Sequence, residues 1–249
     1  MFRFNNDYNR GAHPEILKAL AQNNEESYPG YGADRWCERA QAEILKHLGG
    51  VKAQVHFIVG GTPTNATLIA AALRPWQSVI SVDTGHINAH EAGSIELTGH
   101  KVLAVPAENG KLTARAVEEE CRRYLDGGAP EYLTQPKLAY ISSPSEFGTV
   151  YAKAELEELS AVCKKYGLYL FLDGARLGYW LASEGCDVTL ADLARLTDAF
   201  YIGGTTCGAL FGEALVLGNP ALQDHFRTCM KQRGDVLAKG WLMGLQFYT

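Results

Sequence analysis

Short apolar runs of strand length alternate along this chain with segments of helical spacing, and this alternation constrains the fold more than any other feature. The clearest helical segments, 113–125 and 153–165, each have one polar and one apolar side. Strands that alternate with helices predict an α/β fold with a mainly parallel sheet and helices on both faces. Seven runs have strand length: 55–59, 78–82, 101–105, 138–142, 168–172, 199–202 and 214–217.

Further helices are predicted near both ends of the chain and after the first strand. Segment 14–21 has helical spacing, and so does 34–48, where Asp34 can cap the first turn and Gly49 can end the helix. The pattern also predicts helices over 65–73 and 230–245.

The composition excludes several classes of protein. Of 249 residues, 47% are hydrophobic and 20% are charged, which is too apolar for a disordered chain. The net charge of -5 provides no basic field for a phosphate backbone, so we expect no nucleic-acid partner. No apolar run reaches the roughly 18 residues of a membrane span, and the first residues lack the order of a secretory signal, so we expect no membrane partner and a cytoplasmic location.

The six cysteines are spread through the chain without a C-x-x-C pair. This spacing suggests neither a zinc site nor a disulfide framework, and it favours reduced, mostly buried thiols.

Glycines and a threonine follow the first predicted strand and open a helix, at Gly60, Gly61 and Thr62. Ligands of open α/β sheets bind beyond the carboxyl ends of the strands, and a helix start offers unpaired N–H groups to an anion. The segment therefore predicts a phosphate site. A tight turn with Thr62 as a cap remains the alternative, and the segment is not the G-x-G-x-x-G of dinucleotide sites.

Asp173 ends a strongly apolar run, where an ionised carboxylate needs a cation or several donors. Arg176, three residues later, is one candidate partner in a purely structural pair. In the functional alternative, Asp173 meets a protonated ring nitrogen of a cofactor, and Arg176 is left for an anionic group.

His86 follows another predicted strand, with His90 four residues later. No third ligand falls at a helpful spacing and H-E-x-x-H does not occur, so we predict no metal site. An imidazole at the tip of a strand is suited instead to stacking on a planar ring or to moving protons near neutral pH.

Six motifs occur in order along nearly the whole chain. They are Asn5-Asn6-Asp7-Tyr8, Tyr31-Gly32-Ala33-Asp34, Gly60-Gly61-Thr62 with Asn65, His86 with Glu91, Leu172-Asp173-Gly174-Ala175-Arg176-Leu177 and Tyr201-Ile202-Gly203-Gly204-Thr205. Taken together, these motifs resemble the low-specificity L-threonine aldolase and β-eliminating lyase family, which belongs to the aspartate-aminotransferase-like group of pyridoxal-phosphate enzymes. The resemblance therefore implies pyridoxal 5'-phosphate as cofactor and the large domain of a PLP-dependent transferase-like fold.

The resemblance also implies roles for single residues. His86 stacks on the cofactor ring, Asp173 pairs with the ring nitrogen, and Arg176 lies near the ring oxygen and the substrate carboxylate. Asn6 and Tyr31 are expected to contact the substrate. The phosphate is expected at Gly61 and Thr62, and Gly60 and Thr205 are further expected contacts of the cofactor.

The implied reaction cleaves a small β-hydroxy amino acid into glycine and an aldehyde. An anionic Asp173 keeps the ring nitrogen protonated, so that the ring acts as an electron sink. Removal of the hydroxyl proton starts the cleavage, and either His86 or an ordered water is the base.

One position departs from the family pattern in a way that affects the chemistry. The family has a lysine directly after Gly-Gly-Thr, where this chain has Thr206, and no lysine occurs from residue 166 to residue 230. A threonine hydroxyl forms no imine with the cofactor aldehyde. We therefore expect cofactor binding with impaired turnover, and a non-catalytic, PLP-binding pseudoenzyme or dimer partner is the alternative. A nucleotide-dependent oxidoreductase is disfavoured, because G-x-G-x-x-G and Tyr-x-x-x-Lys do not occur.

The length is the second departure, because family members carry a further C-terminal domain. We predict an N-terminal arm over 1–15, a PLP-binding large domain over 16–240 and the start of a truncated C-terminal domain over 241–249. Family members commonly have serine at the position of Asn6, and asparagine also donates hydrogen bonds. Sites of this group lie at subunit boundaries, so we expect a homodimer or homotetramer in which Tyr31 reaches the neighbouring cofactor.

Overall fold

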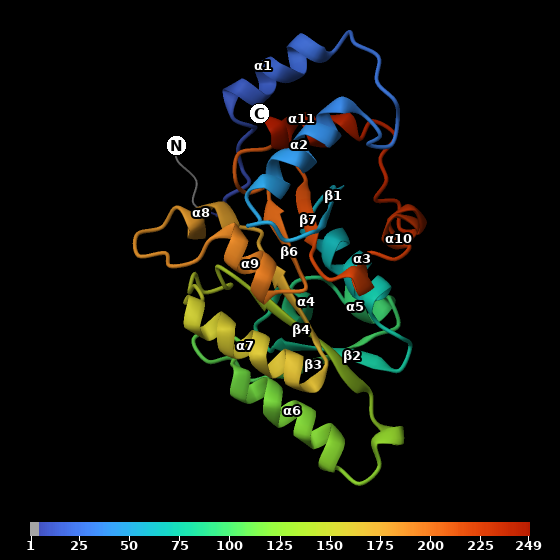
Figure 1. Cartoon of the computed structure of the whole chain (residues 1–249), viewed down its shortest axis with the longest axis vertical. Helices are drawn as coiled ribbons and strands as arrows, with labels where there is room; N and C mark the ends of the chain where they lie inside the picture. Colours follow the sequence, from blue (N-terminus) through green and yellow to red (C-terminus); the bar gives the residue numbers. More distant parts are fainter. Residues whose placement is uncertain (1–4) are drawn as a thin grey trace.

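The computed structural model describes residues 5–249, so residues 1–4 of the predicted N-terminal arm lie outside the described part. Its centre is one seven-stranded sheet in the order β1-β7-β6-β5-β4-β2-β3 (Figure 1). All seven predicted strands form, with ends shifted by at most a few residues. They are β1 Gln54–Ile58, β2 Gln77–Val82, β3 Lys101–Val105, β4 Gln135–Ser142, β5 Tyr169–Asp173, β6 Ala199–Gly203 and β7 Glu213–Leu217.

The sheet is mainly parallel, as predicted. Strand β7 is the exception, because it runs antiparallel to both neighbours, β1 and β6. In that register Glu213, the first residue of β7, lies opposite Gly203, the last residue of β6. The start of β7 therefore lies at the edge where the parallel strands end.

Both faces of the sheet are covered by helices. Along β5 the side chains of Leu170 and Leu172 join one buried cluster and that of Phe171 joins the other, as the two-residue period of a strand requires. Helices α2, α6, α7, α8, α9 and α11 contribute to the first cluster, and α3, α4, α5 and α10 to the second. The helices are α1 Pro14–Asn23, α2 Arg35–Lys46, α3 Gly61–Ala72, α4 His86–Ala89, α5 Ser94–Leu97, α6 Ala114–Asp126, α7 Lys153–Tyr166, α8 Leu177–Leu181, α9 Leu190–Leu196, α10 Phe226–Gln232 and α11 Trp241–Tyr248.

The prediction of one helix over 230–245 is wrong. Two helices, α10 and α11, are separated by residues 233–240. Gly234 has a φ of 83°, in the left-handed region that ends a helix, and the next residue, Asp235, turns inward to accept a hydrogen bond from Thr67 on α3 at 2.5 Å. The apolar spacing thus continues across a break that a glycine and a buried carboxylate impose.

Helix α3 begins earlier than predicted, at Gly61 rather than at Asn65. Pro63 suits a first helical turn, because its φ is fixed near the helical value and its missing N–H has no partner to lose there. Gly61 and Thr62 therefore belong to the helix start itself, and Gly60 is the N-cap.

The last helix, α11, packs on α2 and also contacts α1 (Figure 1). Gly244 on α11 lies against Cys37 on α2, a contact that the sequence did not predict.

The predicted division of the chain into an arm, a large domain and a truncated domain, at residues 15 and 240, stays a prediction. No helix of the described part is both long and apolar enough to cross a membrane. All six cysteines are free, and three of them, Cys37, Cys121 and Cys163, are buried.

Candidate active site

An open cleft lies at the carboxyl ends of the central strands, where ligands of open α/β sheets bind. It gathers seven of the predicted site residues, which come from four separate strand ends: Gly61, Thr62, His86, Asp173, Arg176, Thr205 and Thr206. The other residues that line it are Tyr8, Ser142, Pro144, Glu146, Ala175, Tyr201 and Glu213.

The start of α3 forms one wall of the cleft. Its first N–H groups, at Gly61 and Thr62, have no partner within the helix and lie at the positive end of the helix dipole. A Cβ at position 61 would lie 3.1 Å from the Tyr201 hydroxyl, so glycine keeps this approach open. This wall is suited to an anion.

Asp173, at the end of β5, is only 5% exposed and accepts four hydrogen bonds. Oδ2 accepts from the Tyr140 hydroxyl at 2.5 Å and from Asn65 Nδ2 at 3.2 Å. Oδ1 accepts from the Ala175 N–H at 3.0 Å and from the Tyr201 hydroxyl. These four donors compensate the burial of the carboxylate, so the structural pair with Arg176 does not form.

The two tyrosines are reliable donors to Asp173. Burial raises the pKa of Tyr140 and Tyr201 well above the ordinary value, and the charge of Asp173 adds to the effect. Both hydroxyls therefore keep their protons across the physiological pH range.

His86 begins α4, and its Nδ1 lies 2.7 Å from Glu91 Oε1. The Glu91 side chain is completely buried, whereas that of His86 is 42% exposed. The hydrogen bond to Glu91 raises the pKa of His86 against the opposing effect of burial, and the charges of Asp173, Glu91 and Glu146 contribute further. The ring thus faces the cleft with one nitrogen held by a carboxylate.

Arg176 pairs with Asp7, far away in sequence. Its Nε and Nη2 donate to the two carboxylate oxygens of Asp7, at 3.0 Å for Nη2, and this contact raises the pKa of the guanidinium. The neighbouring Asn6 is exposed, does not line the cleft, and accepts a hydrogen bond from the Tyr8 N–H at 3.2 Å. The N-terminal segment therefore reaches the cleft through Asp7 and Tyr8.

Thr206 lies in the turn after β6 and is largely buried. Its hydroxyl donates to the Ala175 carbonyl, and its own carbonyl accepts from the Tyr179 hydroxyl at 2.9 Å. The side chain at this position is therefore held against the turn that follows Asp173.

The hydroxyl of Thr205 donates to Glu213 Oε1 at 2.8 Å, and the N–H of Gly204 donates to Glu213 Oε2 at 3.1 Å. Burial raises the pKa of Glu213 to about 8 in spite of these donors. The cleft thus holds a second buried carboxyl group beside Asp173.

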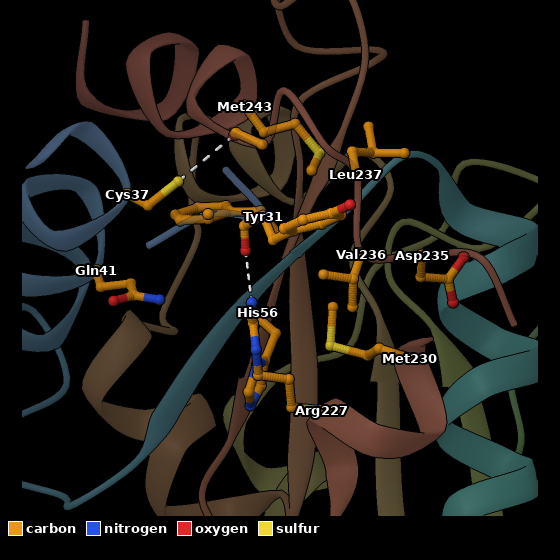
Figure 2. A pocket seen from close by; sticks show the side chains of 13 residues that line it. Tyr31, Cys37, Gln41, His56, Arg227, Met230, Asp235, Val236, Leu237 and Met243 are labelled. Atoms are coloured by element: carbon orange, nitrogen blue, oxygen red, sulfur yellow. Dashed lines mark hydrogen bonds between the residues drawn. The ribbon is translucent and has the colours of Figure 1, made fainter. Parts of the chain in front are cut away.

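Tyr31 does not line this cleft. It lines a separate cavity formed by segments far apart in the sequence, between α2, β1 and the chain from α10 to α11 (Figure 2). Arg227 donates to the Tyr31 carbonyl at 2.5 Å, and Lys231 lies 4.6 Å from the centre of the Tyr31 ring. The Tyr31 side chain is half exposed at this outer position.

Several residues that line or support the cleft were not predicted from the sequence. Ser142 ends strand β4, and Pro144 and Glu146 follow it, so the rule that ligands bind beyond the strand ends applies to them as well. Glu213 was missed because β7 was not recognised as antiparallel, and no sequence signal pointed to Tyr140. Gly60 caps α3 behind the lining residues.

The two histidines of the H-x-x-x-H pair have ring centres 5.8 Å apart. Within residues 5–249 no group of three potential ligands has a metal-binding arrangement.

A protein-family model described as Beta-eliminating lyase matches residues 10–244. The low specificity L-threonine aldolase of Pseudomonas aeruginosa is 32% identical over 239 residues, which span 95% of this chain and 68% of the relative. The corresponding protein of Saccharomyces cerevisiae is 27% identical over 86% of this chain and 54% of its own length.

Solved structures agree with these relationships. A Leishmania major threonine aldolase superposes with a TM-score of 0.94 at 50% identity, covering 98% of this chain and 70% of that protein. Aspartate aminotransferase from Thermus thermophilus has a TM-score of 0.71 at 17% identity, over 97% of this chain and 63% of that protein, and indicates the shared fold alone. The resemblance inferred from the six motifs is thereby confirmed, and the chain belongs to the β-eliminating lyase family of threonine-aldolase-like enzymes.

Proposed function

We propose that this protein is a pyridoxal-phosphate lyase of the threonine aldolase type, which cleaves a β-hydroxy amino acid to glycine and an aldehyde. The observation that carries the proposal is the meeting of three features in one cleft: the anionic Asp173, the His86 ring and the start of α3. These are the groups that a phosphorylated, cationic aromatic ring requires.

The residues present fit the cofactor without a covalent link. Gly61 and Thr62 would hold the phosphate at the start of α3, supported by Gly60 and Thr205, and Asp173 would hold the ring nitrogen. Both oxygens of Asp173 already accept two donors each, so a ring N–H has to share an oxygen with one of them. No lysine lines the cleft among the described residues.

When bound, this cofactor supplies an electron sink for the pair released at the substrate α-carbon. The chain's own residues bind and orient the cofactor and the substrate. His86 presents a ring face beside the cofactor site, and Glu91 fixes the orientation of that ring through Nδ1. Arg176 would bind the substrate carboxylate in exchange for Asp7, with Asn6 nearby.

Impaired turnover follows from Thr206, which we propose stands in the position of the family's lysine. A hydroxyl group does not form an imine, so substrate exchange on the cofactor loses its usual amine. The Thr206 side chain instead donates to the Ala175 carbonyl, next to Asp173. The expected protein binds cofactor and adducts but releases product slowly.

Exchange of Thr206 for lysine tests this proposal. In the unchanged protein, added pyridoxal phosphate should bind reversibly and give no adduct on Thr206 after borohydride reduction. In Thr206→Lys, reduction should fix the cofactor to position 206, as read by mass spectrometry of the peptide, and acetaldehyde should appear from threonine. Thr206→Met, a long side chain without an amine, is the matched control.

Two results would count against the proposal. If the unchanged protein binds no pyridoxal phosphate, the assignment of the cleft is wrong. If Thr206→Lys fixes the cofactor but cleaves no β-hydroxy amino acid, the non-catalytic alternative is favoured.

We further propose a homodimer or homotetramer in the cytoplasm. The half-exposed Tyr31, with Arg227 and Lys231 beside it, lies on an outer surface from which it could reach a second copy. Light scattering tests the assembly, and a monomer that still binds cofactor with full affinity would exclude a shared site. Cell fractionation tests the location.

A further inference from the structure

Glu213 lies between the two strand ends that lead to the expected phosphate contacts. It is the first residue of β7 and pairs with Ile58, the last residue of β1, and with Gly203, the last residue of β6. Strand β1 leads into the start of α3, and β6 leads into the turn that contains Thr205. Glu213 therefore lines the cleft between these two segments, and nothing in the proposed function assigns a role to it.

The two oxygens of Glu213 have partners of different kinds. Oε2 accepts a hydrogen bond from the Gly204 N–H at 3.1 Å, and a backbone N–H can only donate. Oε1 lies 2.8 Å from the hydroxyl of Thr205, which can donate or accept. A proton on this carboxyl group therefore belongs on Oε1, where the partner is able to accept it.

The contacts of Thr205 depend on the charge of Glu213. The Thr205 hydroxyl oxygen accepts from the Gly212 N–H at 3.1 Å, which leaves it one lone pair and one hydrogen. Opposite an ionised Glu213, the hydrogen is donated to Oε1. Opposite a protonated Glu213, the lone pair accepts from Oε1 and the hydrogen of Thr205 is released. Because Thr205 lines the cleft and is only partly buried, an anion bound there can accept this hydrogen.

Binding of an anion and binding of a proton are linked at this position. Glu213 is buried, and burial raises its pKa to about 8, with a further contribution from the charge of Asp173. An anionic ligand beside Thr205 adds another negative charge and raises this pKa further. The protonated form of Glu213 is therefore favoured when the ligand is bound.

We propose that Glu213 takes up a proton when a phosphate group binds at the start of α3, and that this proton turns the Thr205 hydroxyl toward the phosphate. The inference rests on the proposed function. It makes Glu213 a positioning residue, because Glu213 acts on the ligand through Thr205. The proton comes from solvent and forms an O–H bond at Oε1, whereas Thr205 keeps its own hydrogen and only reorients it.

Two ligands that differ only in the phosphate group test this linkage. 4-Deoxypyridoxine 5'-phosphate and 4-deoxypyridoxine have no aldehyde, so neither forms an imine with a lysine. Calorimetry at about pH 8.5, in buffers of different ionisation enthalpy, counts the protons taken up on binding. At this pH the phosphate is fully ionised, and Glu213 is mainly ionised until the anion binds. The unchanged protein should therefore take up roughly half a proton more with the phosphorylated ligand.

The pH dependence of the affinities provides a second measurement. Between about pH 7 and about pH 9.5, the phosphorylated ligand should lose roughly tenfold in affinity relative to the unphosphorylated one, because Glu213 has to bind its proton against a rising pH. In Glu213→Gln, the NH₂ group donates to Thr205 at every pH. The ratio of affinities should then be constant, and the extra proton uptake should vanish.

The other titratable groups are the same in this variant. Asp173 on β5 and Tyr201 on β6 interact with Glu213, and burial keeps the Tyr201 hydroxyl protonated. His56 on β1 stays neutral at these pH values, because burial lowers its pKa to about 4. The remaining titratable side chains of the cleft are those of Tyr8, His86, Glu146 and Arg176. Glu96→Gln removes an exposed charge on α5 and should behave like the unchanged protein.

A second pair of variants covers the case that Glu213→Gln does not fold. Thr205→Val removes the hydroxyl that connects Glu213 to the phosphate and that favours the ionised carboxylate, so the extra proton uptake should vanish. Thr205→Ser keeps the hydroxyl and should retain the uptake. If the unphosphorylated ligand binds too weakly to measure, the phosphorylated ligand is compared between the unchanged protein and each variant.

The outcomes separate the two proposals. If neither ligand binds the unchanged protein, the proposed cofactor site fails and the role of Glu213 fails with it. If the phosphorylated ligand binds without the extra proton uptake, or if that uptake survives in Glu213→Gln or Thr205→Val, only the role of Glu213 is overturned.

Discussion

His86 follows strand β2 and Asp173 ends strand β5, and β4 lies between these strands, yet two buried side chains connect the two residues. Glu91 Oε1 lies 2.7 Å from His86 Nδ1 and accepts a hydrogen bond from Asn65 Nδ2 at 2.8 Å. The same Asn65 nitrogen donates to Asp173 Oδ2 at 3.2 Å. One continuous set of hydrogen bonds therefore orients the ring of His86 and the carboxylate of Asp173 together.

This connection predicts the titration of His86. Glu91→Gln removes the acceptor charge but keeps the shape, so the pKa of His86 should fall from its raised value toward the ordinary one. NMR titration of the ring in the cofactor-free protein measures it. Asp173, Glu146 and His90 also face the ring and stay unchanged in this variant.

The exposed Glu96 provides a control, because Glu96→Gln should leave the His86 titration unchanged. An unaltered pKa in Glu91→Gln would mean that Glu91 does not hold the ring in solution.

The contact between Asp7 and Arg176 predicts competition with anionic ligands. Asp7 occupies the guanidinium with a carboxylate, as the substrate would. Asp7→Asn should therefore strengthen binding of N-phosphopyridoxyl-glycine relative to N-phosphopyridoxyl-methylamine, which has no carboxylate, by about two- to fivefold, because a partly exposed ion pair is weak. Weaker binding in calorimetry would instead show that Asp7 positions Arg176 for the ligand.

Glu213 predicts a particular dependence of stability on pH. Its pKa is about 8 in the folded protein against an ordinary value of 4.5, so the folded state binds the extra proton between these values. The free energy of unfolding therefore falls as pH rises from about 4.5 to about 8. Glu213→Gln removes this loss.

Thermal melts measure the effect. The difference in melting temperature, Glu213→Gln minus the unchanged protein, should be a few degrees larger at about pH 8.5 than at about pH 5. About 1 kcal/mol of unfolding free energy corresponds to roughly 2–4 °C in a domain of this size. Glu96→Gln should show no such trend. A constant difference across this range would mean that Glu213 is ionised in the folded protein.

The sheet was predictable because the central strands are apolar runs that are largely buried on both faces, and because helices α6 and α7 each have one apolar side. The strand ends then indicated Gly61, His86 and Asp173, since parallel strands finish at one edge. Spacing could not reveal the partner of Arg176, because Asp7 lies 169 residues away. Contacts of that range depend on how the finished sheet places the N-terminal segment.

Two further features, the position of Glu213 and the break between α10 and α11, were not predicted from the sequence, for identifiable reasons. Glu213 begins a strand, and only the antiparallel direction of β7 brings it to the edge where the others end. The break between α10 and α11 was hidden because apolar residues continue at helical spacing through Gly234 and Asp235.

Gly244 predicts how closely α11 and α2 have to pack. A Cβ at this position would lie 2.4 Å from the Cys37 backbone nitrogen, which cannot move without shifting α2. Gly244→Ala should therefore cost about 1–3 kcal/mol of unfolding free energy. Gly11→Ala, where a Cβ meets nothing within 4 Å, should be close to neutral in the same urea titration. Equal stability of the two variants would contradict this packing.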